Sequence, residues 1–412
     1  MPAGAREGTI SGVSLLPAPP HDRVDVTRWV QTHLGHLTCD EVRPSPWRGG
    51  QQAADRALAT LDITGYASRR SAVFPVERRG ASRLSPYIRH GLLPLPQVWA
   101  AVADAPAKDR QKFRDELMWQ EYARHLYARL GRATAEPLRF GPPVGTGPWQ
   151  GEPWPAEMAC MAATTEELHD EGWLVNQARM WLSSQYAVRA GRDWREGAQE
   201  MYRHLLDGSP AANRLGWQWT VGTGTGKVYG FSRWQVEKRA PGLCRDCPLN
   251  RACPVQDWPA ATSGPRVEPP AGLAGGPTDA GPVSPVLTGE AEAVWLTAES
   301  LGDTDPALAA HPDLPAVFVF DEPLLATLRL SGKRLVFLAE TLAELGAEVR
   351  QLEVRLGDPV EELRGRPLAT TWAYVPGWKR RSAALDVVAL HPWPWLRRPG
   401  SGSLRSYSAW AR

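Results

Sequence analysis

Three cysteines stand close together in the chain, and their spacing is typical of a metal-binding loop. Cys244, Cys247 and Cys253 form a C-x2-C-x5-C-P pattern in a turn-rich segment. Clustered thiolates are ligands for tetrahedral zinc or for an iron–sulfur cluster. The fourth ligand must come from elsewhere, with Cys160 as the first candidate and Cys39 as the alternative. No histidine lies near the loop in sequence, which argues against a mixed cysteine–histidine finger but leaves a four-thiolate zinc site, an iron–sulfur cluster or free thiols.

A second group of polar and aromatic residues recurs at helical spacing. Its members are Glu116, Trp119 and Gln120 on one predicted helix and Asn176, Arg179 and Met180 on another. Residues at i, i+3 and i+4 share one face of a helix. Flat rings beside an amide suit stacking on a planar ligand. A solvated glutamate beside a half-buried tryptophan would give the same pattern.

Two loops carry further binding chemistry. The stretch ASRLSPYIRHG (81–91) is a hydroxyl-rich turn with an arginine, just before a predicted helix, and helix starts attract anions. By itself it is only a Ser-Pro turn. The stretch LLDGSPAANRLGWQW (205–219) contains Asp207 and Asn213 and ends in the aromatic pair Trp217 and Trp219.

The elements that position these residues divide the chain into parts. Residues 1–25 are predicted to be a flexible arm, 26–258 a helical domain, 259–292 a linker rich in proline and glycine, and 293–412 an α/β domain with a loop-like tail after 395. Amphipathic spacing predicts helices over 108–131, 165–189 and 196–206. Apolar runs predict strands over 293–298, 316–320, 352–356, 369–374 and 386–390.

The predicted fold class is therefore α followed by α/β. Continuous apolar strands that alternate with helices indicate a doubly wound parallel sheet covered on both faces, a Rossmann-like arrangement. The α/β part lacks a G-x-G-x-x-G fingerprint, so a dinucleotide site of that type is not expected there.

Four stretches resemble, in order, motifs of the photolyase and cryptochrome family. They are SRLSPYIRHG (82–91), DELMWQEYARHL (115–126), GWLVNQARMWL (172–182) and DWREGAQEMYRHLLDGSPAANRLGWQWTVGTGT (193–225). In that family the first motif wraps the flavin diphosphate, and the others surround the flavin. The resemblance implies FAD as cofactor and an all-helical FAD-binding domain.

Carried over residue by residue, the resemblance implies roles for many positions. Around FAD it implies Tyr66, Ser82, Arg83, Leu84, Ser85, Gln120, Asn176, Arg179, Asp207, Ser209 and Asn213. Arg179 would pair with Asp207, and Asn213 would face the flavin N5. For the substrate and its repair it implies Glu116, Trp119, Met180, Asn213 and Trp219, and for electron transfer Trp217 and Trp194. Trp119 and Trp219 would wall a pyrimidine dimer flipped out of DNA. Met180 stands where photolyases for cyclobutane dimers carry a methionine, so the resemblance favours cyclobutane dimers as the substrate.

Some positions depart from the family pattern. Gln120 replaces an arginine that contacts the flavin phosphates, and Ser209 replaces an aspartate of the flavin loop. The outer tryptophan of the family's electron-transfer chain has no confident match. Flavin binding is therefore expected more firmly than a normal redox potential or full repair.

The α/β half resembles the family's N-terminal antenna domain, which here follows the helical domain. VWLTAESLGDTDPAL (294–308) resembles its opening VWFRxDLRxxDNPAL but lacks the arginines. The swapped order implies a circular permutation, and the antenna chromophore remains unknown. Iron–sulfur photolyases place one cysteine well before a C-x2-C loop, so the resemblance favours a 4Fe–4S cluster on Cys160, Cys244, Cys247 and Cys253, with zinc as the alternative.

Composition adds little to the choice of function. The net charge is +2, from 47 basic and 45 acidic residues, so no overall charge demands nucleic acid or membrane. A cytoplasmic monomer without a membrane span is expected. The predicted function is light-driven, FAD-dependent repair of cyclobutane pyrimidine dimers in DNA. The alternative is a cryptochrome-like blue-light or redox sensor, and a DNA-binding module with structural zinc is a third possibility.

Overall fold

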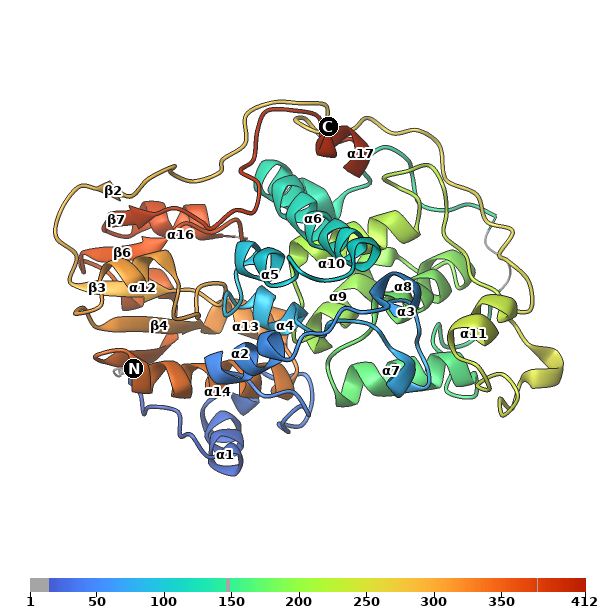
Figure 1. The fold of residues 1–412 in the computed structure, drawn as a ribbon, viewed down its shortest axis with the longest axis horizontal. Helices are drawn as coiled ribbons and strands as arrows, with labels where there is room; N and C mark the ends of the chain where they lie inside the picture. The colour runs from blue at the N-terminus through green and yellow to red at the C-terminus, as the bar shows by residue number, and fades with distance from the viewer. Residues whose placement is uncertain (1–14, 146–148, 376) are drawn as a thin grey trace, which may run out of the picture.

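The fold was described from a computed structural model, which covers residues 15–145, 149–375 and 377–412. Helices dominate the first part of the chain and a seven-stranded sheet is built mainly from the last part (Figure 1). Within the described ranges every helix is too short or too polar to cross a bilayer.

The helices before the sheet, in chain order, are α1 (Arg23–Leu34), α2 (Gln51–Ala59), α3 (Tyr66–Arg69), α4 (Ser85–Arg89), α5 (Leu95–Ala101), α6 (Ala107–Leu130), α7 (Ala159–Asp170), α8 (Asn176–Ser183), α9 (Trp194–His204), α10 (Pro210–Thr220) and α11 (Arg233–Arg239). Short 3₁₀ turns lie at Gly35–Leu37, Val76–Arg78, Gly131–Ala135 and Asn250–Ala252, and a π-helical turn at Ser184–Arg189.

Helix α6 confirms the predicted helix over 108–131. Phe113, Leu117 and Leu126 are buried along one face, as the periodic pattern predicted. The helix ends at Gly131, whose φ of 53° lies in a region that side chains disfavour.

The predicted helix over 165–189 is wrong as a single element. Helix α7 ends at Asp170, and Gly172 has a φ of 71°. The chain then turns and restarts as α8 at Asn176, which continues into the π-helical turn. The break leaves Asn176 at the start of a helix instead of in the middle of one.

The sheet has the strand order β1-β5-β4-β3-β6-β7-β2. Its strands are β1 (Leu15–Leu16), β2 (Val286–Leu287), β3 (Ala293–Leu296), β4 (Ala316–Asp321), β5 (Leu352–Gly357), β6 (Leu368–Thr371) and β7 (Val387–His391). The five central strands are parallel and confirm the predicted strands, whereas the two edge strands pair antiparallel and were not predicted.

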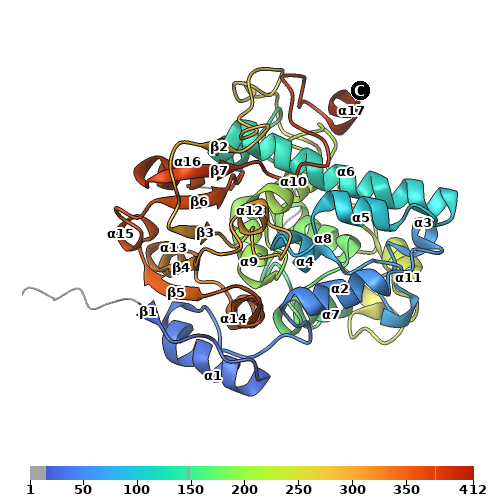
Figure 2. The same ribbon diagram turned by 60° about the vertical axis from the view of Figure 1, so that its left-hand side comes forward.

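Both faces of the sheet are buried, which explains why its strands read as continuous apolar runs. Along β4, Phe318 and Phe320 face one core, which also contains residues of α14 (Gly332–Glu348), and Val317 and Val319 face the other. Figure 2 shows α1 and α14 next to each other on one side of the sheet. The helices of this part are α12 (Pro306–Ala310), α13 (Glu322–Leu328), α14 (Gly332–Glu348), α15 (Pro359–Glu362), α16 (Trp378–Ala384) and α17 (Tyr407–Ala411).

Residues 15–34 pack with the sheet part of the fold, contrary to the stretch 15–25 of the predicted arm over 1–25. Residues 1–14 lie outside the described residues, but β1 pairs with β5 and α1 packs on α14. Trp29 of α1 lies 6.2 Å from the ring of Phe320. Sequence did not reveal this because the strand contains only two residues and depends on β5 for its hydrogen bonds.

The segment over 259–292 connects the two parts of the fold and packs against both. Arg266 bridges to Phe140, Leu273 is buried with Trp410, and β2 adds to the sheet edge. The tail differs from the predicted loop because it forms helix α17, which lies against α6 (Figure 1).

Candidate functional site

A buried ion pair joins two of the predicted flavin residues. Arg179 of α8 donates from Nη2 to Oδ2 of Asp207 at 2.7 Å, and Asp207 is 9% exposed. The other oxygen of this carboxylate, Oδ1, is buried and has no hydrogen-bond partner among the described residues. A buried carboxylate oxygen without a hydrogen-bond partner destabilises the folded protein, so a ligand that donates a hydrogen bond to Oδ1 would fit here.

The serine-rich turn lies beside the start of α8. Ser85 accepts a hydrogen bond from the indole of Trp173 at 3.0 Å, and Trp173 directly precedes the residues that lead into Asn176. Arg83 has a φ of 60°, which is uncommon for a side-chain-bearing residue, and its guanidinium lies over the rings of Trp47 and Trp173.

The remaining residues predicted to hold the flavin phosphates and ribityl chain differ in burial. Leu84 is fully buried, Ser82 is half-buried, and Tyr66 packs edge-on against Phe113 at 5.1 Å. Burial raises the pKa of the Tyr66 hydroxyl. Asn176 is exposed and its amide lies 3.5 Å from the sulfur of Met180.

Asn213 lies on α10, Ser209 is the N-cap residue of this helix, and α10 packs against α9. The amide of Asn213 donates to the carbonyl of Ala198 at 2.7 Å, and Ser209 is buried at the start of α10. The side-chain amide of Asn213 is thus already hydrogen-bonded to the backbone of α9, whereas the resemblance implies that it faces the flavin N5.

The predicted substrate residues lie on α6, α8 and α10, which pack together. Glu116 pairs with Lys112 at 2.9 Å and with Arg70 at 3.4 Å, and Gln120 is half-buried on the next turn. Trp219 is 37% exposed and lies 5.4 Å from Tyr229.

Trp119 is covered by the tail of the chain. Its ring stacks on Tyr407 of α17 with centroids 4.1 Å apart and planes 11° from parallel. No sequence pattern indicated this contact, because the two residues are far apart in the chain and the tail was predicted to be a loop.

Trp194 and Trp217 are both buried, at 2% exposure, in one core. Trp217 lies edge-on to Tyr186 with centroids 5.9 Å apart, and Tyr186 lies 5.2 Å from Trp154. Trp217 packs so closely on Gly197 that a Cβ there would lie 2.3 Å from its ring. An aromatic chain thus leads from Trp217 toward the half-buried Trp154.

A cavity of about 430 Å³ separates α9 and α10 from the sheet. Asn213 and Arg195 line it from the helices, and Thr297, Glu299 and Asp321 line it from the ends of β3 and β4. The carboxyl ends of parallel strands are a common place for ligands, and this volume suits a small molecule.

The four predicted cluster cysteines come together. Cys160 is buried in the first turn of α7, and Cys244 and Cys253 pack against the same core. Burial, together with the three neighbouring thiols, raises the pKa of Cys160, and burial raises the pKa of Cys244 to about 11. Cys247 lies 3.5 Å from the backbone N–H of Ala159.

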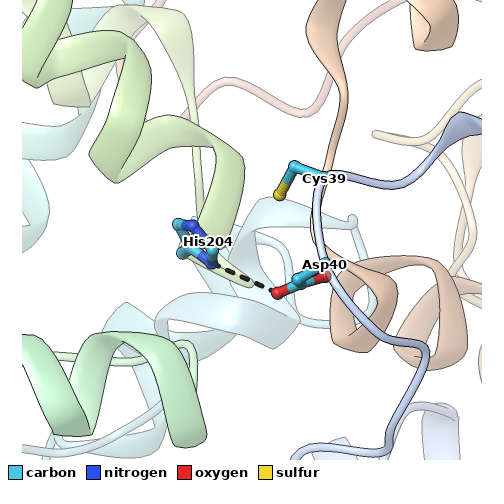
Figure 3. Close-up of side chains that lie close together, drawn as sticks. All are labelled: Cys39, Asp40 and His204. Atoms are coloured by element: carbon cyan, nitrogen blue, oxygen red, sulfur yellow. Dashed lines mark ion pairs between the residues drawn. The ribbon is translucent and has the colours of Figure 1, made fainter.

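Cys39, the alternative fourth ligand, lies elsewhere. Its sulfur lies within 4.8 Å of ligand atoms of Asp40 and His204 (Figure 3). Of the two candidates, Cys160 is the one that lies beside Cys244, Cys247 and Cys253.

Comparison with known proteins supports the flavin resemblance over part of the chain. Residues 113–239 match the family model described as FAD binding domain of DNA photolyase. A deoxyribodipyrimidine photo-lyase of Thermus thermophilus is 32% identical over 192 residues, which cover 44% of each protein. One from Synechococcus is 31% identical over 199 residues, covering 42% of this chain and 37% of that protein.

Similar solved structures are also photolyases and cryptochromes. The class III photolyase of Agrobacterium tumefaciens has a TM-score of 0.38 at 23% identity and covers 47% of this chain and 43% of that one. The Synechocystis cryptochrome has a TM-score of 0.41 at 19% identity, with 48% and 46% covered. The chain spans less than half the length of the curated relatives it matches. Residues 113–239 are therefore similar to the FAD binding domain of DNA photolyase, and the similarity covers less than half of the chain.

Proposed function

We propose that the protein is a flavoprotein that uses light to repair cyclobutane pyrimidine dimers in DNA. The observation that carries this proposal is the buried Arg179–Asp207 pair with its unsatisfied carboxylate oxygen, inside the region similar to the FAD binding domain. When bound, FAD supplies light-driven transfer of a single electron.

The residues present fit FAD in most respects. The turn of Ser82, Arg83, Leu84 and Ser85, together with Tyr66, would hold the phosphates and ribityl chain. Asn176, Arg179, Asp207 and Asn213 would surround the ring, and Asp207 Oδ1 would accept its missing hydrogen bond from the flavin. Gln120 and Ser209 would be neutral contacts where the family places charged ones.

The lesion-binding residues would hold the substrate in a pocket beside the flavin. Trp119 and Trp219 would provide apolar walls for a flipped dimer, and Met180 would contribute to the wall between them. Glu116 would accept hydrogen bonds from the pyrimidine N–H groups. Aromatic stacking on a base contributes about 1–3 kcal/mol per base, which suits damaged DNA as the partner.

We further propose that the cysteines hold a 4Fe–4S cluster. Cys160 on a helix and the loop of Cys244, Cys247 and Cys253 offer four soft ligands from two elements. Four thiolates also suit tetrahedral zinc, so metal and sulfide analysis of the purified protein distinguishes the two.

The order of the two parts supports a circular permutation of the family's architecture. The central strands follow the order β5-β4-β3-β6-β7, and the segment over 259–292 links the helical part to β3. In this proposal the identity and the site of an antenna chromophore stay open, because the cavity between the parts is lined by Asn213, which is assigned to the flavin ring.

A cryptochrome-like sensor that binds FAD without repair is the second candidate. It is favoured by one specific contact, because Tyr407 covers the ring of Trp119 on which a dimer would stack. The deciding experiment illuminates the purified, reduced protein with ultraviolet-damaged DNA and counts dimers. Their light-dependent loss supports repair, whereas photoreducible bound FAD without any loss of dimers would leave only the sensor.

A further inference from the structure

Five potential metal ligands meet where α7, α9 and the loop after α1 come together. His169, Glu200 and His204 form one group whose donor atoms all lie within 4.8 Å of one another. Cys39, Asp40 and His204 form a second such group (Figure 3). None of these residues belongs to the flavin or cysteine sites described above.

His204 belongs to both groups, and its two ring nitrogens face different partners. Nε2 lies 3.2 Å from Oε1 of Glu200, one turn earlier on α9. Nδ1 lies 3.5 Å from Oδ2 of Asp40, the contact drawn in Figure 3. The ring of His169, on the last turn of α7, lies 4.5 Å from that of His204 at an angle of 65°.

Lys333 decides which side of the imidazole is open to a cation. Its ammonium lies 3.3 Å from Nδ1 of His204 and 3.5 Å from Asp40, and its side chain is 1% exposed. A fixed positive charge there opposes a second cation among Cys39, Asp40 and Nδ1. The Nε2 side faces Glu200 and His169 instead.

We propose that His169, Glu200 and His204 bind one divalent transition-metal ion of the zinc class. Two imidazoles and a carboxylate are a donor set that suits zinc and its neighbours. The 3.2 Å separation of Nε2 and Oε1 matches the edge of about 3.3 Å expected for a tetrahedron with bonds of about 2.0 Å. The side chain of Glu200 is 36% exposed, so water can reach a fourth position.

Asp40 acts in this proposal as a support for the metal-binding histidine. Metal-bound histidines commonly donate their second N–H to a carboxylate, which fixes the ring and its tautomer. Asp40 Oδ2 lies 3.5 Å from Nδ1, so binding of a metal at Nε2 requires Nδ1–H to donate to Asp40 and the ammonium of Lys333, now 3.3 Å from Nδ1, to pair with Asp40 alone.

The test uses the full-length protein with its native cofactors, after removal of loosely bound metal with a chelator. Zinc chloride is titrated calorimetrically, and anomalous scattering at the zinc edge of a crystal locates the ion. One zinc per chain between His169, Glu200 and His204 is expected. The affinity for zinc should fall about tenfold in Asp40→Asn, as it does when other residues that hydrogen-bond a metal-bound histidine are changed. Zinc binding should be lost in Glu200→Gln and His169→Gln.

Two matched variants serve as controls. His311→Gln alters a histidine pair of the sheet part, where His311 and His391 are 3.0 Å apart, and should bind zinc normally. Cys39→Ser alters the Nδ1 side and should also bind normally. Bound FAD and the thermal unfolding midpoint without zinc check that each variant is folded. Unchanged affinity in folded His169→Gln, or an ion located beside Cys39, would overturn the proposal, and neither result bears on flavin-dependent repair.

Discussion

Trp119 and Tyr407 lie face to face, with ring centroids 4.1 Å apart and planes 11° from parallel. One residue belongs to the long helix α6 and the other to the short helix at the end of the chain. The stack places the tail over a residue that the family resemblance assigns to the lesion pocket. Binding of a flipped dimer against this face would require Tyr407 to move.

Removal of Tyr407 should therefore improve binding of damaged DNA. Tyr407→Ala exposes Trp119, and affinity for a dimer-containing oligonucleotide should rise by about 1 kcal/mol, the strength of an aromatic pair. Trp119→Ala should weaken the same affinity by about 1–3 kcal/mol. Fluorescence anisotropy measures both, and Tyr407→Phe is the control that keeps the stack. Equal weakening by Tyr407→Ala and Trp119→Ala would show that the two rings form one binding surface.

The Arg179–Asp207 pair should control retention of FAD. Asp207→Asn removes the negative charge that faces Arg179, and the weakened hydrogen bond should cost about 1–3 kcal/mol of flavin affinity. The ratio of flavin to protein absorbance after gel filtration measures the loss. Asp170→Asn, which breaks the exposed pair with Arg43, is the matched control and should retain FAD. Full flavin occupancy in Asp207→Asn would contradict the proposed site.

The cysteine loop should lose its metal when any of the four thiols is removed. Cys160→Ser and Cys244→Ser should each lower iron and acid-labile sulfide per chain, because a 4Fe–4S cluster requires four thiolates. Cys39→Ser should keep both, since Cys39 lies beside His204. Stoichiometric zinc in place of iron in protein purified without oxygen would refute the cluster.

The aromatic chain from Trp217 should carry electrons during photoreduction of the flavin. Trp154→Phe should slow photoreduction, because Tyr186 links Trp154 to Trp217 with centroid distances of 5.2 and 5.9 Å. Transient absorption under blue light measures the rate, and Trp234→Phe, at an exposed and remote tryptophan, should leave it unchanged. If photoreduction keeps its normal rate in Trp154→Phe but is blocked in Trp194→Phe, the electrons travel through Trp194 and Trp217, the route that the family resemblance implies.

Asp305 should make stability depend on pH in the acidic range. Burial raises its pKa from 3.8 to about 6, although it accepts hydrogen bonds from Thr371, Ala307 and Leu308. Between these values the folded state binds more protons than the unfolded state, so stability falls as pH rises from about 4 to about 6 and is then constant. The total change would be at most about 3 kcal/mol.

Asp305→Asn tests this pH dependence. The amide oxygen can still cap α12, and the variant carries no charge to desolvate, so the decrease in stability over that pH range should disappear. Denaturant unfolding at pH 4, 5, 6 and 7 measures it for both proteins. The same slope in the variant would assign the dependence to another group.

The sequence predicted the central architecture well because its signals are local. The five parallel strands are continuous apolar runs, and α6 has periodic apolar residues ended by a glycine. The edge strands β1 and β2 were missed because two residues carry no period and gain their hydrogen bonds only from β5 and β7. The break before Asn176 depends on a left-handed glycine at 172 within an otherwise helical pattern.

The sequence by itself determined which residues could bind a flavin or a metal, because motif, residue type and spacing are written along the chain. Tertiary structure alone decided which of them meet. It brought Cys160 to the cysteine loop, placed Tyr407 on Trp119, and gathered Asp40, His169, Glu200 and Lys333 around His204. These contacts join segments that fold together only when the helices and the sheet bury a shared core, so no local pattern in the chain records them.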